Sequence, residues 1–413
     1  MGVMRMQVKD RKRSGFTRNV SFMFVIYWGV LVFWQNVSGA ETRGTIDLLL
    51  KVGLMGYFVG FYLLRVRAFK AKAFLVVLLA MSLMITASTE SQFSLSNIVA
   101  YAYPIIILFV VYGFGDDLQV NRLQLLAFCN CVIVITLYAA IYAVIFCWDQ
   151  FAGALSLDYA YGNELSSFFV SSHEYGMYLV AAIISCIFCM DLSEKKSSLQ
   201  KVYYLAVIAV LAVNLVLTFS RTSMMGLAVF LLVYTIWGKK SARKWFLLLG
   251  VAAVAVLAIS PKLTEFVFNI VFKGNNAAGR DILLEKGLEY FNSGSLLQKF
   301  FGYGIYETRS YFEHYFDHGS VHNAYLQVLL YFGLTGFGMM VCYLLSQLFA
   351  GFRFRKKNTY IGAISAGLLL SAMSMMFTNT AIIFTSSIDS FFLTMFFVLI
   401  PKYVRNSIRK QAF

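Results

Sequence analysis

Charge is scarce in this chain. Asp, Glu, Lys and Arg make up 13% of the 413 residues, whereas 60% are hydrophobic and 17% are aromatic. A soluble globular domain carries roughly 25% charged residues. The composition therefore excludes a soluble domain and indicates a polytopic membrane protein.

Cysteine is also rare, and its six copies all fall within predicted spans, where a thiol is usually a small apolar filler. The Cys186-x-x-Cys189 pair is interpreted as packing, because a pair within lipid has no ready route to a partner thiol. Neither a disulfide framework nor a zinc site is implied. The chain also lacks an internal repeat.

Long apolar runs are abundant. A helix needs roughly 20 apolar residues to cross a bilayer, and this criterion predicts an all-α fold with about 12 transmembrane helices. Their expected positions are 20–37, 45–64, 73–89, 93–114, 124–147, 167–190, 202–219, 222–237, 245–260, 321–349, 359–377 and 381–400.

Basic residues set the orientation, because short loops rich in Lys and Arg stay in the cytoplasm. The N-terminal segment and every second loop are basic, which predicts a cytoplasmic location for both termini. Because these charges are spread over loops instead of gathered on one soluble face, nucleic-acid binding is not expected. They include Arg11, Arg65, Arg122, Lys195, Lys239, Arg353 and Arg405.

Other basic residues fall in the membrane or on the outer side, against the charge rule, and need another reason to be there. Among them are Arg221, Arg280 and Arg309, and a guanidinium fork matches phosphate oxygens in bidentate fashion. For Lys51, which lies with Asp389 inside predicted spans, a structural ion pair and a proton relay both stay open.

One long stretch, 261–320, contains no predicted transmembrane helix and separates the spans 245–260 and 321–349. We expect an extracytoplasmic loop there, because a loop of that length is usually functional. Within it, residues 281–291 have apolar positions at 283, 284, 288 and 291, which predict a helix along the membrane surface. The expected organisation is therefore transmembrane helices 1–9 in 1–260, the loop with short helices in 261–320, and helices 10–12 in 321–413.

All four histidines fall on the outer side. His314, His318 and His322 are spaced by four, so on one continuous helix they would form a ladder able to share a metal. Against this, no carboxylate completes a metal signature and Gly319 interrupts the run. We expect no metal.

His322 differs from the others because it opens a strongly apolar span. An imidazole titrates near ~6.5, which suits the removal of a proton from an attacking hydroxyl, but a histidine that only caps a helix is equally compatible.

Arg221 stands between two spans with almost no loop, where a charge is usually paired or functional, although a snorkelling Arg remains open. Arg280, on the large loop, could also be a solvated surface charge.

At these residues the chain resembles the O-antigen ligase and O-antigen polymerase (Wzy) superfamily. The similarity covers about 200–345 and depends on the order and sidedness of several weak motifs. They are Ser220-Arg221-Thr222-Ser223, Arg280-x-x-x-Leu284, Gly302-x-Gly304, and His322-Asn323-x-x-Leu326-Gln327 followed by Gly333-x-x-Gly336.

The resemblance implies a GT-C-like, inverting glycosyltransferase that acts on the outer face with glycans carried on undecaprenyl pyrophosphate. It implies no cofactor, no metal and no nucleotide sugar. Arg221 and Arg280 match the family's basic positions and would bind the pyrophosphate, and His322 would be the catalytic base. The chain departs from the family at Tyr331, where an acidic residue is usual.

The chain has three candidate functions, two of them related glycosyl transfers and one of another class. A polysaccharide polymerase for O-antigen, capsule or exopolysaccharide is preferred, because the loop is modest and nothing in the chain points to lipid A core. An O-antigen ligase, which uses lipid A core as acceptor, is the alternative. A lipid-linked oligosaccharide flippase or transporter is less favoured, because repeated halves and a charged central cavity are not evident in the sequence.

The expected partners are a lipid-linked donor, a lipid-linked acceptor or lipid A core, the bilayer and, as an open alternative, a chain-length regulator. The expected location is the bacterial cytoplasmic (inner) membrane.

Overall fold

The computed structural model describes most of the chain from residue 122 onward. The described stretches are 122–156, 164–169, 171–192, 197–238, 280–316, 321–355 and 359–379, with isolated residues at 49, 52, 53, 56, 261, 264, 265, 396, 399–401, 403 and 404. Among the predicted spans, 20–37, 45–64, 73–89, 93–114 and 245–260 lie outside the described stretches, as do Lys51 and Asp389, and only isolated residues of 381–400 are described.

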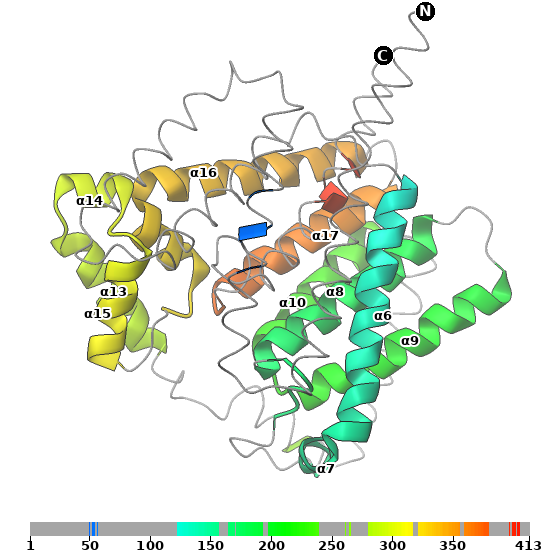
Figure 1. The fold of residues 1–413 in the computed structure, drawn as a ribbon. Helices are drawn as coiled ribbons and strands as arrows, with labels where there is room; N and C mark the ends of the chain where they lie inside the picture. The colour runs from blue at the N-terminus through cyan, green and yellow to red at the C-terminus, as the bar shows by residue number, and fades with distance from the viewer. Residues whose placement is uncertain are drawn as a thin grey trace, which may run out of the picture.

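The described residues form helices and no strands (Figure 1). The helices are α6 (Arg122–Phe146), α7 (Trp148–Leu155), α8 (Ser172–Leu192), α9 (Ser198–Leu217), α10 (Arg221–Trp237), α13 (Arg280–Ser293), α14 (Leu296–Phe301), α15 (Ile305–Phe316), α16 (Ala324–Arg355) and α17 (Thr359–Met376).

Four helices are long and apolar enough to cross a membrane: Leu125–Phe146, Ser172–Leu192, Ser198–Leu217 and Ala324–Phe354. They confirm the predicted spans 124–147, 167–190, 202–219 and 321–349 to within a few residues. The spans 222–237 and 359–377 are present as shorter apolar helices. The described residues thus confirm an all-α membrane protein, while twelve helices and a GT-C-like layout stay expectations.

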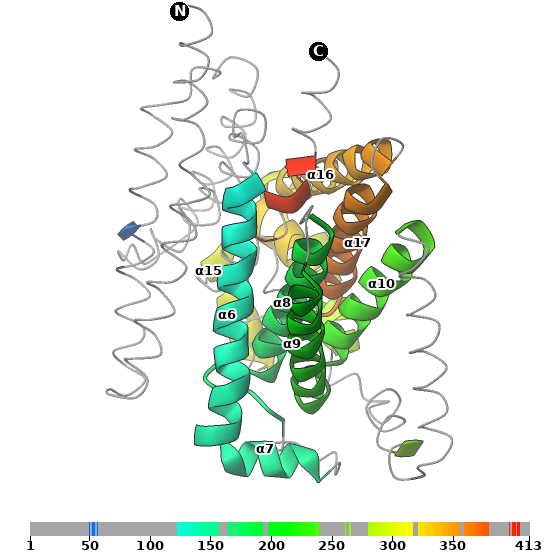
Figure 2. The ribbon, with the colours of Figure 1, turned by 90° about the vertical axis from the view of Figure 1, so that its right-hand side faces the viewer.

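Helix α8 is the centre of this bundle and α9 its periphery. In α8, 89% of the apolar stretch is buried inside the protein, whereas in α9 only 22% is buried. Figure 2 shows α6, α8 and α9 side by side, with α7 turning away across the end of α6. Exposed apolar side chains such as Leu199 and Leu205 on α9 fit contact with lipid, because lipid tails are as apolar as these side chains.

Successive helices run in opposite directions, so the bundle has two ends. At the Arg122 end, Arg122 donates to the carbonyl of Leu192 and Tyr234 donates to Asp191. At the His322 end, Leu165 N–H donates to the carbonyl of Leu217. The basic loops predicted to be cytoplasmic follow the helix termini of the Arg122 end.

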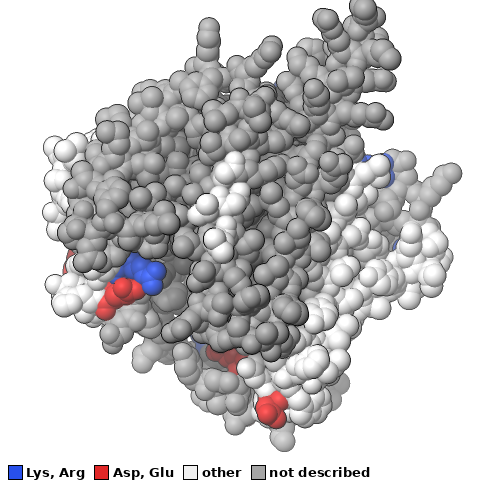
Figure 3. Space-filling model, in the orientation of Figure 1, with Lys and Arg blue, Asp and Glu red and all other residues white. Residues whose placement is uncertain are grey.

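Between α10 and α16, the described residues 280–316 form three helices that gather beside the bundle (Figure 1). Figure 3 shows few charged side chains on the described part of this face: a basic and an acidic one lie together on the α13–α15 side, and a separate acidic one lies at the lower edge. Exposed ion pairs occur on these helices at Lys286–Glu289 and Arg309–Glu313.

The helix predicted at 281–291 is confirmed as α13, while its position along the membrane surface stays a prediction. Leu283 is buried, whereas Leu284 and Leu288 are 39% and 43% exposed. The buried face instead contains Gly287, where an added Cβ would meet Leu326 at 2.6 Å. A glycine carries no hydropathy signal, so close helix contact at that position was not visible in the apolar pattern.

Helix α16 is kinked near its beginning, which the predicted continuous span did not anticipate. Gly333 has φ 63° and ψ −164°, a conformation that essentially only glycine adopts. A Cβ there would lie 2.4 Å from the backbone carbon of Phe300. The kink is therefore where α14 packs its backbone against α16.

Candidate functional site

Arg221 follows a tight turn that joins α9 to α10. Phe219 has a left-handed φ of 52°, which is strained for a bulky residue. Ser220 N–H donates to Thr218 Oγ1 at 3.2 Å, and Thr218 Oγ1 donates to the carbonyl of Leu215 at 2.7 Å. These bonds hold the turn that makes Arg221 the first residue of α10.

His173, near the start of α8, supports the same turn from the side. Its Nδ1 lies 3.1 Å from Ser220 Oγ, and Ser220 Oγ lies 2.9 Å from Ser223 Oγ. Ser220 and Ser223 are fully buried. Since the Ser220 hydroxyl is engaged in this way, it makes no side-chain cap bond to α10.

His322 lies in a second strained turn, immediately before α16. Its φ is 52°. Asn323 follows as the N-cap, and its Oδ1 accepts from Leu326 N–H at 3.0 Å. Asn323 thus supplies a side-chain cap to α16, while the role of the His322 imidazole stays a prediction.

The end of α17 links the two turns. Asn323 Nδ2 donates to the carbonyl of Phe377 at 3.1 Å, and the hydroxyls of Thr222 and Thr378 lie 2.7 Å apart. One dipeptide, Phe377-Thr378, thus contacts the residue after His322 and the residue after Arg221. The structure brings Arg221 and His322 to the same end of the bundle.

Arg280 begins α13, and only its backbone is described. Gly287 of α13 packs on Leu326 of α16, while the end of α13 reaches Tyr303, whose N–H donates to the carbonyl of Leu330. Later residues of α13 therefore lie farther from the start of α16 than earlier ones do. The beginning of α13 is directed toward the His322 side.

The histidine ladder is not formed. Helix α15 ends at Phe316 and α16 begins at Ala324, so His314 and His322 lie on different elements, and His318 lies outside the described stretches. His314 is exposed and packs edge-on against Tyr315 with ring centroids 4.9 Å apart. Within the described stretches no group of three or more His, Cys, Asp or Glu side chains is placed to hold a metal ion.

The α13–α15 helices pack through a stack of tyrosines. The ring of Tyr290 lies 4.2 Å from that of Tyr303 and 4.0 Å from that of Tyr311. Tyr290 donates to Glu307 at 3.3 Å, and the second carboxylate oxygen of Glu307 is buried without a hydrogen bond. Burial raises the pKa of Glu307, and the bond from Tyr290 lowers it by less.

Sequence reasoning missed the residues that connect the site. His173, Ser220 and the Phe377-Thr378 dipeptide were not singled out as supports, because their role depends on contacts between helices far apart in sequence. The polar run Thr378-Asn379-Thr380 at the end of an apolar span was the available signal for the last of them.

Residues 205–341 match the family described as O-antigen ligase. No curated protein matches the chain. The matched stretch begins in α9 and ends in α16, so it includes Arg221, Arg280 and His322.

Proposed function

Since residues 205–341 match the family described as O-antigen ligase, we propose that this chain is a polysaccharide polymerase of the O-antigen ligase and O-antigen polymerase superfamily. It transfers a growing glycan from undecaprenyl pyrophosphate to the next lipid-linked repeat unit on the outer face of the bacterial inner membrane. The observation that carries the proposal is the linkage of the His322 and Arg221 turns through Phe377-Thr378.

The proposed chemistry is a single displacement. An acceptor hydroxyl oxygen attacks the anomeric carbon of the donor, and the bond from that carbon to the phosphate oxygen breaks. His322 takes the proton of the hydroxyl, and the electron pair of the broken bond leaves with undecaprenyl pyrophosphate. Attack from the face opposite the leaving group inverts the anomeric centre.

Arg221 and Arg280 bind the pyrophosphate in this scheme. Their charge stabilises the negative charge that grows on the leaving oxygen in the transition state. Arg221 suits this role because it is half-buried at a turn held by several hydrogen bonds. A group held in place before the reaction needs little reorganisation during it.

The outer location follows from the two ends of the bundle. The loops after α8 and α10 carry Lys195, Lys196, Lys239 and Lys240 and adjoin the Arg122 end. By the positive-inside rule that end faces the cytoplasm. The His322 end then faces outward, where lipid-linked glycans are presented.

Ligation to lipid A core is the second candidate, because the matched family is described as O-antigen ligase. We prefer the polymerase because nothing in the chain points to lipid A core. Transport of a lipid-linked oligosaccharide, the candidate of another class, predicts flipping in liposomes without any new glycosidic bond.

One assay separates the three. Purified protein in liposomes receives lipid-linked repeat units alone, or repeat units together with lipid A core. The polymerase lengthens the lipid-linked chains in the first mixture. Product that appears only with lipid A core would overturn the polymerase in favour of the ligase, and movement of substrate without any product would overturn both.

A further inference from the structure

A polar stripe leads along α16 from the candidate site toward α15. Asn323, Gln327 and Tyr331 are spaced by four residues, so they lie on one face of the helix. Gln327 Nε2 donates to Tyr331 Oη at 2.8 Å, and both residues are buried. Polar side chains within an apolar span usually mark a substrate path or a functional contact.

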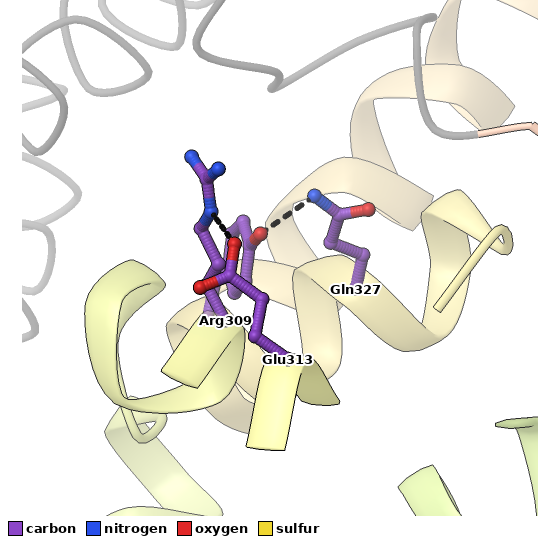
Figure 4. Close-up of polar contacts among 4 residues, drawn as sticks. Arg309, Glu313 and Gln327 are labelled. Atoms are coloured by element: carbon purple, nitrogen blue, oxygen red, sulfur yellow. Dashed lines mark hydrogen bonds and ion pairs between the residues drawn. The ribbon is translucent and has the colours of Figure 1, made fainter. Parts of the chain in front are cut away.

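The stripe ends at an ion pair on α15. Arg309 Nε donates to Glu313 Oε1 at 2.6 Å. Figure 4 shows Arg309, Glu313 and Gln327 close together where α15 meets α16. The polar face of α16 and the ion pair of α15 therefore meet at this contact.

The cluster has unused hydrogen-bonding capacity. Its contacts within the described stretches engage only Nε of Arg309, one oxygen of Glu313 and the acceptor side of Tyr331 Oη. The terminal nitrogens of Arg309 point away from Glu313 (Figure 4), and the side chains of Arg309 and Glu313 are 62% and 48% exposed. Two guanidinium nitrogens of Arg309 and one carboxylate oxygen of Glu313 are thus available to a ligand, whereas Tyr331 is buried.

The charge of the cluster selects the kind of ligand. Arg309 and Glu313 cancel each other, so the site offers no net attraction to a phosphate. It offers donors and an acceptor side by side, and neighbouring hydroxyls of a sugar both donate and accept.

We propose that Arg309 and Glu313, supported by the buried Tyr331, form a saccharide subsite that binds a neutral, hydroxyl-rich sugar of the lipid-linked glycan. This proposal rests on the proposed function for the identity of the glycan. Tyr331 lies about two turns, or roughly 10 Å, along α16 from its first residue. A short oligosaccharide can span that distance, with its reducing end at His322 and a later sugar at the subsite.

Binding of free oligosaccharide tests the subsite apart from transfer. The probe is an oligosaccharide of one to three repeat units, released by mild acid from the surface polysaccharide of the producing cell and titrated into the purified protein in nanodiscs. Wild type is expected to bind it, and Glu313→Gln and Tyr331→Phe to weaken binding about tenfold each, or ~1.4 kcal/mol. Tyr331→Phe keeps the ring and removes only the hydroxyl.

The matched control is Glu289→Gln, which breaks the similarly exposed Lys286–Glu289 pair on α13 and is expected to bind as wild type does. In the transfer assay, Glu313→Gln and Tyr331→Phe are expected to raise KM about tenfold with kcat within about twofold. Equal melting temperatures confirm that the variants are folded.

The subsite is overturned if Glu313→Gln and Tyr331→Phe bind the oligosaccharide as tightly as wild type, or if Glu289→Gln weakens it equally. Failure of the proposed function looks different. His322→Asn is expected to lose transfer and retain oligosaccharide binding. If this variant were fully active, His322 would not be the catalytic base, but the subsite proposal would still stand.

Discussion

At the scale of single residues, the site depends on strained backbone. Within the described stretches, the non-glycine residues with positive φ are Ser167, Phe219 and His322. Ser167 belongs to the segment that bonds to the end of α9, so all three lie at the His322 end. Such conformations cost on the order of 1–3 kcal/mol each and persist where surrounding contacts hold them.

Replacement of His322 by Asn separates its backbone from its chemistry. Asn tolerates a left-handed φ better than Ala does, so the turn is expected to persist while the base is lost. We expect transfer to fall by about 10²–10⁴-fold with normal amounts of protein in the membrane. The control is His314→Asn on α15, which is expected to keep wild-type rates; a His322→Asn variant with undiminished kcat would contradict the assigned role.

His173 is expected to act through Ser220 on the position of Arg221. His173→Ala removes the contact to Ser220 Oγ and should raise KM for the lipid-linked donor more than it lowers kcat. His173→Asn places an amide near the position of Nδ1 and should restore much of the affinity. Steady-state kinetics of both variants check this, and an Asn variant no better than Ala would argue against positioning through that hydrogen bond.

At the scale of elements, the sequence predicted helix positions well and contacts between helices less well. Spans such as 167–190 and 202–219 were visible because their apolar residues run continuously. The contact of α13 with α16 and the kink of α16 were not visible, because they depend on Gly287 and Gly333, which let another element approach closely. In the same way, Arg221 and His322 could be singled out from charge and sidedness, but their connection through α17 needed the packed structure.

Two glycines of α16 make a matched pair that tests the kink. Gly333→Ala adds a Cβ against the backbone of Phe300 and Phe301 at a positive φ, whereas a Cβ at Gly338 meets nothing within 4 Å. We expect Gly333→Ala to lower stability by about 2–5 kcal/mol and Gly338→Ala to leave it nearly unchanged. Thermal unfolding in detergent measures both, and equal melting temperatures would rule out a close α14–α16 contact.

The raised pKa of Glu307 makes the packing of α13–α15 depend on pH. Burial favours the neutral carboxyl, so the folded-state pKa lies above the unfolded value. The contribution of Glu307 is therefore fully present below its ordinary pKa of about 4.3 and is lost as pH rises through the raised pKa.

Glu307→Gln removes this dependence and keeps an acceptor for Tyr290. The variant is expected to match wild type in melting temperature near pH ~4 and to exceed it near pH ~7.5, where the wild-type carboxyl becomes charged. Lys286→Gln, at an exposed position on α13, serves as control. A wild-type advantage that grows with pH would show that the Glu307 charge is stabilised instead of penalised.

At the scale of the whole molecule, the two ends of the bundle differ in chemistry. The Arg122 end adjoins loops rich in Lys, and the His322 end gathers strained turns, hydroxyl contacts and the α13–α15 helices. The sequence predicted two different ends from charge alone, because the positive-inside rule depends only on which loops carry Lys and Arg. The match of residues 205–341 to the O-antigen ligase family supports the proposed reaction class, and we propose that the reaction takes place at the His322 end.

Binding of the donor pyrophosphate at the His322 end is the central claim, and the most direct measurement is a cryo-EM structure of the protein in nanodiscs with a non-hydrolysable undecaprenyl pyrophosphate glycan. We predict a pyrophosphate within hydrogen-bond distance of the Arg221 guanidinium, about 2.7–3.2 Å, with the anomeric carbon facing His322. A pyrophosphate bound at the Arg122 end, or one remote from both Arg221 and His322, would contradict it.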